Sequence, residues 1–215
     1  MTEDFAILIH SHGRADSVTT PRTLRECGYT GKYVVVVDDM DEHVDEYVEK
    51  FGKKVVVFPK SKMEGTFDAG DNFTDTPPTQ IYACIASFDI ARELGVKYFM
   101  FMDDDMTDFI YRFDDELMYG FEHAGSLDEI LEALLEFYEV SGAKAVAFSQ
   151  NGHFIGGQHG TFGQSVFTKR MCMGTWLCST ERNFDFVSRL NEDVSTYISL
   201  GKVGNLFFTL NQISS

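Results

Sequence analysis

The sequence predicts an α/β fold in which helices flank a mainly parallel central sheet. Short apolar runs alternate with helix-forming segments through the first hundred residues, as in a doubly wound sheet. The run of four valines within 33–37 is continuous, which indicates a strand covered on both faces. Two runs end in acids, Asp38-Asp39 and Asp103-Asp104-Asp105, and parallel strands bring such ends to one edge. A polar site is therefore expected at that edge.

The first half alternates strands and helices at regular spacing. Pro21 suits the first turn of a helix, and Gly52 and Gly95 suit helix ends. The segment 61–78 is rich in Gly, Asp, Thr and Pro, so we expect a long loop. The expected strands are 5–9, 33–37, 55–58 and 98–102, and the expected helices are Val18 or Pro21 to Cys27, 41–51 and 79–94.

The second half has a weaker pattern. We expect a helix over 127–140 with Ser126 as its cap, a strand over 143–148, a helix opening at 191–193 and a strand over 206–210. The segment 151–164 holds five glycines, and its part 154–160 could form a flexible acceptor loop whose backbone approaches the substrate. For the segment 171–178 no helix or strand is predicted.

Length and composition predict one globular domain over residues 1–215. The chain has 215 residues, of which 44% are hydrophobic, enough for a packed core. Its apolar runs fall short of the ~20 residues that a membrane helix needs, and the N-terminus lacks the basic start of a signal peptide. The four cysteines form no CxxC pair, which favours reduced thiols in the cytoplasm.

The charge balance argues against tight, unaided binding of nucleic acid. The formal net charge is −16 and the sequence pI is about 4.6. Proteins that hold a bare duplex usually present a basic face or a pI above ~9. Only weak, transient contact with such a polymer is compatible with this composition.

The triplet Asp103-Asp104-Asp105 follows the apolar run 98–102. Its charges repel one another unless a cation neutralises them, and carboxylate oxygens with substrate phosphates suit Mg²⁺ or Mn²⁺. The spacing Asp103-x-Asp105 fits a metal-dependent nucleotide-sugar site. We expect Asp103 and Asp105 to bind the metal, with Asp105 as the direct ligand, and Asp103 and Asp104 to contact the nucleotide sugar. A solvated acidic turn is the alternative.

Further candidates follow the first two strands. Asp38 or Asp39 could accept a hydrogen bond from a uracil imide or a ribose hydroxyl; a capping role in the next turn is equally compatible. Ser11 and Arg14 lie in the polar loop after the first strand. The forked donors of Arg14 could clamp a diphosphate, although a lone loop arginine is more often an ordinary surface residue.

Two acids late in the chain are candidate catalytic residues. Glu192 and Asp193 follow Asn191 at the start of an expected helix. A carboxylate near the acceptor could take the proton of an attacking hydroxyl as general base. The alternative is an acidic first turn favoured by the helix dipole, and chemistry alone favours that alternative.

The pattern Asp103-x-Asp105-x-Thr107 also fits a haloacid-dehalogenase phosphatase. Asp103 would then be the nucleophile and Asp105 the acid/base. That family carries its motif on the first strand, whereas two or three strands precede it here. The phosphatase is kept as the alternative of another class.

The order of these motifs resembles the GT-A glycosyltransferases, which have a Rossmann-like domain and a DxD metal motif. A narrower likeness is to the bacteriophage TET-associated glycosyltransferases, which are related to the GREB-type transferases. It is carried by NEDVSTYISLGKVGNLFFT at 191–209 and by FIGG at 154–157. The family's Arg-Asn after strand three is replaced by Gly70-Asp71-Asn72, so Asn72 is the candidate donor-binding residue there.

The resemblance implies a metal-dependent enzyme that uses Mn²⁺ or Mg²⁺. It would move a sugar from a nucleoside-diphosphate sugar, expected to be a UDP-sugar, to a hydroxymethylated pyrimidine in phage DNA. Its place would be the cytoplasm of a bacterial host, without a membrane partner. Residues 1–110 would form the nucleotide-sugar-binding half and 111–215 the acceptor-side half.

Besides the phosphatase, three further alternatives stay open. A glycan, small-molecule or protein acceptor is compatible with the same fold, and so is a non-catalytic module that only binds sugar nucleotides. The sequence ends at Ser215, where GT-A enzymes usually continue to a metal-binding histidine, which leaves truncation as the third.

Overall fold

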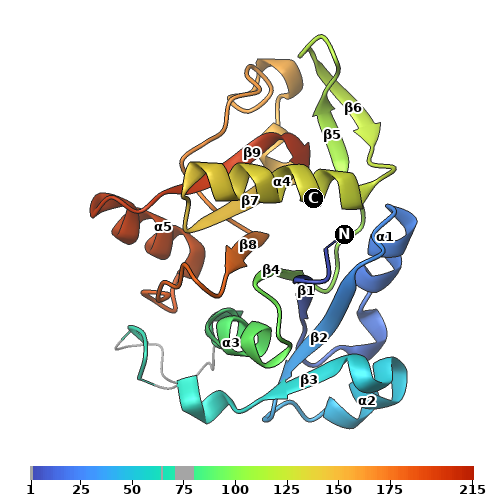
Figure 1. Cartoon of the computed structure of the whole chain (residues 1–215), viewed down its shortest axis with the longest axis vertical. Coiled ribbons are helices and arrows are strands. Elements are labelled where there is room, and N and C mark those ends of the chain that lie inside the picture. The colour runs from blue at the N-terminus through green and yellow to red at the C-terminus, as the bar shows by residue number, and fades with distance from the viewer. Residues whose placement is uncertain (1, 64, 71–79) are drawn as a thin grey trace.

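The computed structural model describes residues 2–63, 65–70 and 80–215. In this part of the chain the strands form one nine-stranded sheet in the order β3-β2-β1-β4-β8-β7-β9-β5-β6. Helices cover both of its faces (Figure 1). The predicted α/β class, with a central sheet flanked by helices, is confirmed.

The strands and longer helices have the following bounds. The strands are β1 Phe5–His10, β2 Lys32–Asp38, β3 Val55–Phe58, β4 Tyr98–Asp103, β5 Ile110–Phe113, β6 Tyr119–His123, β7 Ala145–Ser149, β8 Trp176–Ser179 and β9 Phe207–Ser214. The helices are α1 Thr20–Glu26, α2 Val44–Phe51, α3 Gln80–Glu93, α4 Leu127–Ser141 and α5 Glu192–Lys202. Short 3₁₀ turns connect several of them, including η4 Asn151–Phe154 and η5 Gly157–His159.

The first half of the sheet is parallel and sets the position of the site. Strands β3, β2, β1 and β4 run in the same direction, and His10 pairs with Asp103 across β1 and β4. Asp38 pairs with Phe58 across β2 and β3. The carboxyl ends of these strands therefore meet at one edge, where open α/β sheets bind ligands.

The second half makes the sheet mixed, whereas a mainly parallel sheet was predicted. Strand β8 runs antiparallel to both β4 and β7, β9 runs parallel to β7, and the β5–β6 hairpin extends the edge. Strands β5, β6 and β8 were not predicted. They are short, and β8 is stabilised by neighbours far away in the sequence, so no long local pattern marks them.

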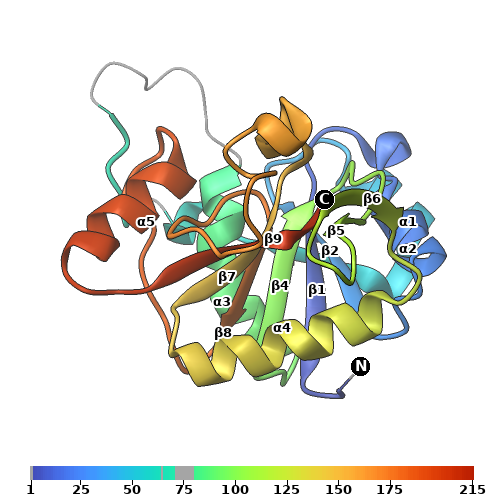
Figure 2. The same cartoon turned by 90° about the horizontal axis from the view of Figure 1, so that it is seen from above.

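Each face of the sheet has its own hydrophobic core. On one face α4 lies across the strands and buries Leu127, Leu131, Leu134 and Tyr138, which share one side of the helix (Figure 2). On the other face α3 is buried against residues of β1, β2 and β4. The two layers fix the strand ends from both sides.

The state of the cysteines and the length of the helices bear on two predictions made from the composition. The four cysteines are free thiols, and all are buried. Among the described residues, the helices are too short or too polar to cross a membrane.

Candidate functional site

Two cavities open at the carboxyl edge of the parallel strands, and they adjoin each other. The β1 cavity has a volume of about 340 Å³ and is lined by His10, Ser11, His12, Arg14, Asp38, Phe58, Gln80, Ala83 and Asp103. The α5 cavity has a volume of about 210 Å³ and is lined by Gln80, Cys84, Phe101, Asp103, Gln150, Gly174, Trp176, Phe186, Glu192 and Asp193. Gln80 and Asp103 belong to both, so they stand where the two cavities meet.

Asp103 is the last residue of β4 and is partly buried. Gln80, at the start of α3, donates its side-chain amide to Asp103 Oδ1 at 3.1 Å. Burial raises the pKa of Asp103, and the negative charge of Asp105 raises it further. The ionised form of Asp103 is therefore disfavoured by its surroundings, which a nearby cation would reverse.

Asp104 is fully buried and holds the loop after β1 in place. Arg14 donates to both of its carboxylate oxygens, with the Nε···Oδ2 distance at 3.1 Å, and the Ser11 hydroxyl donates to Oδ2. The backbone oxygen of Asp104 accepts from Thr19 N at 2.8 Å and Thr20 N at 3.0 Å. Its carboxylate thus connects two strand ends inside the protein.

The Arg14 side chain remains accessible to solvent although it forms hydrogen bonds with Asp104. The side chain is 48% exposed, its guanidinium lies 3.5 Å from Asp105 Oδ2, and the residue lines the β1 cavity. Asp105 is 60% exposed. Folding therefore places Ser11 and Arg14, both predicted site residues, beside the acids of the triplet.

The two acids at the end of β2 have different surroundings. Asp38 is buried, lines the β1 cavity and accepts a hydrogen bond from His12 Nδ1 at 2.9 Å. The Lys60 ammonium lies 3.7 Å from Asp38 Oδ1. Asp39 is exposed and accepts from the backbone N–H of Lys60 at 2.9 Å. Only Asp38 thus faces a ligand-sized space.

Glu192 and Asp193 begin α5, and both line the α5 cavity. Burial raises the pKa of Glu192, and the charges of Asp193 and Asp103 raise it further. Asp193 Oδ1 accepts from the backbone N–H of Val194 at 2.6 Å. Glu192 and Asp193 thus line the same cavity as Asp103, about ninety residues earlier in the sequence.

Several lining residues were not predicted from the sequence. His10 and His12 carry a local signal, because they are polar residues between an apolar strand and Gly13. Gln80 and Trp176 carry none, since only the packing of α3 and β8 beside β4 brings them to the site. Asn72, which was predicted, lies outside the described residues.

The residues present fit a divalent cation held together with a substrate. Within the described part of the chain, no group of three or more His, Cys, Asp or Glu side chains could hold a metal ion by itself. Mg²⁺ is commonly held by one or two carboxylates, while phosphates and water complete its shell. Asp103 and Asp105, which are close enough for the charge of Asp105 to raise the pKa of Asp103, would be such a pair.

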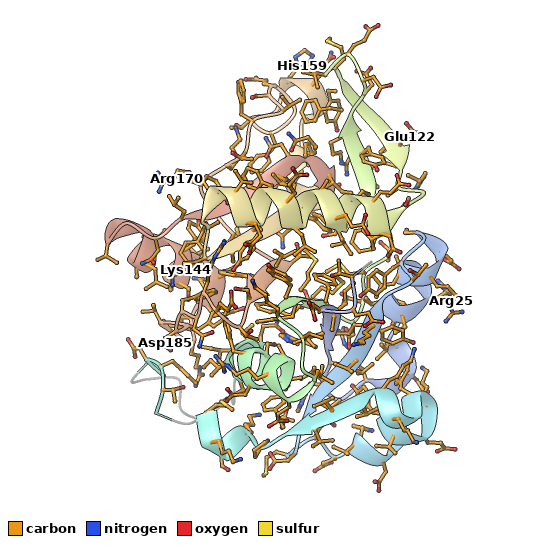
Figure 3. The ribbon with its side chains drawn as sticks, in the orientation of Figure 1. Arg25, Glu122, Lys144, His159, Arg170 and Asp185 are labelled. Carbon is orange, nitrogen blue, oxygen red and sulfur yellow. The ribbon has the colours of Figure 1, made fainter. Side chains whose placement is uncertain are left out.

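The glycine-rich segment lies apart from this charged group. It forms the turns η4 and η5, and His159 is exposed at its outer end, beside the β5–β6 hairpin (Figure 3). Gln150, immediately before η4, is its link to the α5 cavity. His159 lines neither cavity.

A cavity lined by acids at the carboxyl edge of parallel strands defines an α/β ligand-binding protein. The sequence matches the TET-associated glycosyltransferase family over residues 5–215. Because the match spans nearly the whole chain, the protein belongs to this family. The predicted family is thereby confirmed.

More distant likenesses were found among solved structures. S. aureus TarS, residues 1–349, has a TM-score of 0.49 and 15% identity, over 97% of this chain and 58% of that one. Glucosyl-3-phosphoglycerate synthase from Mycobacterium tuberculosis, solved with Mg²⁺ and UDP, has a TM-score of 0.49 and 10% identity, over 96% of this chain and 68% of that one. This chain thus spans under two thirds of the length of the TarS fragment. No curated protein matches the sequence significantly.

Proposed function

We propose that this protein is a metal-dependent glycosyltransferase. It moves a sugar from a nucleoside-diphosphate sugar, a UDP-sugar, to the hydroxyl of a hydroxymethylated pyrimidine in phage DNA. Family membership supports sugar transfer. The observation that carries the proposal is Asp103, which lines both cavities and so can face a donor in one and an acceptor in the other.

The β1 cavity is the donor side of the proposal. Its volume of about 340 Å³ is at the lower end of small-molecule sites, which start near ~300 Å³. Asp38 offers a buried acceptor to the nucleoside, and Arg14 brings positive charge towards the diphosphate while Asp104 holds it. These contacts orient the donor before transfer.

Asp103 and Asp105 would hold Mn²⁺ or Mg²⁺ in this enzyme. The bound ion would act as a Lewis acid that stabilises the negative charge on the leaving diphosphate. Gln80 fixes the orientation of Asp103 through its 3.1 Å hydrogen bond. Arg14 adds charge from the other side of Asp105.

The α5 cavity is the acceptor side. Its aromatic walls, Phe101, Trp176 and Phe186, suit a flat pyrimidine ring that has left the DNA stack. Glu192 and Asp193 are the candidate bases for the attacking hydroxyl. Burial raises the pKa of Glu192, which makes it a stronger base than an ordinary carboxylate.

The experiment compares Asp105→Ala with Asp115→Ala, a matched change of an exposed acid in the turn between β5 and β6. Release of UDP from UDP-sugars is measured with Mn²⁺, with and without DNA that contains hydroxymethylated pyrimidines. We expect Asp105→Ala to lose at least ~100-fold in rate and Asp115→Ala to match wild type. Wild-type turnover by Asp105→Ala would contradict the proposal. A covalent phosphate trapped on Asp103 would support the phosphatase alternative.

One observation favours a second acceptor class. The net charge of −16 disfavours close approach of DNA, so a glycan, small molecule or protein remains an alternative acceptor. An acceptor panel separates the two. Transfer to hydroxymethylated DNA without transfer to the other acceptors would identify DNA as the substrate, and the reverse result would favour the second class.

A further inference from the structure

His10, the last residue of β1, has a defined tautomer. Its Nε2 lies 2.8 Å from Ser87 Oγ, and Ser87 Oγ donates to the backbone oxygen of Ala83 at 2.8 Å, one turn earlier in α3. A hydroxyl has one proton to donate, so Ser87 accepts from His10. The proton of the imidazole is therefore on Nε2, and Nδ1 is an acceptor.

This acceptor is buried and lacks a hydrogen-bond partner among the described residues. Burial lowers the pKa of His10 to about 3, so the ring stays neutral at physiological pH. Phe101 stacks on the ring with a centroid distance of 4.9 Å, which fixes its plane. A buried polar atom without a partner is costly, and a ligand that donates to it would remove that cost.

The strand order indicates which part of a donor would meet His10. Strand β1 lies between β4, which carries Asp103, and β2, which carries Asp38. Neighbouring strands are ~4.8 Å apart, so His10 stands about midway between the two acids. With the diphosphate at Asp103 and the base at Asp38, the ribose lies over β1. Its hydroxyls are donors of the kind that Nδ1 lacks.

We propose that His10 Nδ1 accepts a hydrogen bond from a ribose hydroxyl of the donor nucleotide, and that this contact selects ribonucleotides over deoxyribonucleotides. The inference rests on the proposed nucleotide-sugar donor. It adds a specificity-determining residue from β1, whereas Asp38 and the triplet lie on β2 and at the end of β4.

The test is calorimetric titration, with Mn²⁺, of UDP, 2′-deoxy-UDP and 3′-deoxy-UDP. In wild type we expect the loss of one of the two hydroxyls to weaken binding about tenfold, since the acceptor is left without a partner. His10→Phe keeps the stacked ring and removes Nδ1. It should bind UDP and that deoxy form equally well. His123→Phe, an exposed histidine of β6, is the control and should keep the wild-type ratio.

The outcomes separate this inference from the proposed function. If wild type binds no UDP with Mn²⁺, the donor proposal fails and this inference with it. If UDP binds and both deoxy forms bind as tightly as UDP does, only the role of His10 is overturned. A His10→Phe variant that keeps the wild-type ratio overturns it too.

A second variant covers the case in which His10→Phe does not fold. Ser87→Ala removes the acceptor that keeps the proton on Nε2, so the proton can move to Nδ1. We then expect the discrimination between UDP and its deoxy form to fall. An unchanged ratio in a folded Ser87→Ala protein would overturn the proposal.

Discussion

Three adjacent carboxylates at the end of β4 have three different surroundings. Asp103 is shared by two cavities, Asp104 is buried under Arg14, and Asp105 is largely exposed. Successive side chains point to opposite sides where a strand ends, so neighbours in sequence need not share a function. The predicted roles of Asp103 and Asp105 at a metal, and of Asp104 at the nucleotide, stay predictions. The geometry gives Asp104 a clear part in positioning Arg14.

Removal of the Arg14 side chain should destabilise the protein even without substrate. Arg14→Ala leaves the fully buried Asp104 carboxylate without its guanidinium. Because Arg14 is 48% exposed, we expect the loss to be smaller than the about 3–5 kcal/mol of a fully buried pair. Urea unfolding followed by circular dichroism measures the change. Arg25→Ala, at an exposed position of α1, should be close to wild type. A stable Arg14→Ala protein would show that water replaces the guanidinium.

The buried imidazole of His10 predicts a pH dependence of stability. Its pKa is lowered by burial to about 3 in the fold, against about 6.5 when unfolded. The unfolded chain therefore binds a proton first as pH falls. Stability is fully present above pH ~6.5 and is lost towards pH ~3, by roughly 2 kcal/mol between pH 7 and pH 5.

The measurement is urea unfolding of wild type and His10→Phe at pH 7 and pH 5. The difference between the two pH values should be smaller in His10→Phe by about the same ~2 kcal/mol, because phenylalanine does not titrate. An equal pH dependence in both proteins would mean that His10 is already protonated in the fold, or that the unfolded state protects it.

At the scale of elements, the glycine-rich segment 151–164 has regular local structure, while the flexible acceptor loop at 154–160 stays a prediction. It forms two 3₁₀ turns, and the His153 ring stacks on Phe162 with a centroid distance of 4.4 Å. A Cβ at Gly163 would overlap the backbone oxygen of Gly157, and one at Gly160 would lie 2.6 Å from the backbone oxygen of Ile155. The glycines here allow close packing of backbone on backbone.

Two glycine substitutions in this segment should differ in their effects. Gly163→Ala places a methyl group against the Gly157 carbonyl and should cost about 1–3 kcal/mol, the usual cost of overpacking. Gly152→Ala meets no atom within 4 Å and should be near neutral. Hydrogen exchange over 151–164 and thermal melting measure both. Equal protection in the two variants would show that the segment adapts without cost.

At the scale of the whole molecule, the mixed sheet brings together the two ends of the site. Strand β8 lies between β4 and β7, so the second half of the chain is joined directly to the parallel half. Helix α5 then presents Glu192 and Asp193 to the cavity that Asp103 also lines. The proposed donor and acceptor sides are therefore built from distant parts of the chain.

Neutralising Asp103 should separate stability from function across the molecule. Burial raises the pKa of Asp103, so its ionised form opposes folding at neutral pH. Asp103→Asn, which cannot ionise, should therefore raise the melting temperature without metal. It should also abolish the added stabilisation by UDP with Mn²⁺.

Thermal melting with and without UDP and Mn²⁺ checks both effects in one experiment. Asp115→Asn, at an exposed position, serves as the control. It should show neither the raised melting temperature nor the loss of stabilisation by UDP with Mn²⁺. A destabilised Asp103→Asn protein would mean that the hydrogen bond from Gln80 depends on the carboxylate charge.

Much of the parallel half was predictable because its signals are local. The valine run of β2 and the aromatic run of β4 mark buried strands, and their acids mark the edge. The β5–β6 hairpin and β8 were not predicted, since four- or five-residue strands with mixed composition carry little periodicity. Gln80 was not predicted, because only its hydrogen bond to the Asp103 carboxylate in the folded protein marks it as a site residue.

The sequence by itself determined the α/β class, the family and the acids at the strand ends, because each depends on runs of neighbouring residues. Only the tertiary structure decided that Asp104 is a buried partner of Arg14, that Asp38 rather than Asp39 faces a cavity, and that His10 carries an acceptor without a partner. Those properties arise from contacts between β1, β2, β4 and α3. Long-range packing sets burial and hydrogen-bond partners, and these in turn set the charge and the function of a side chain.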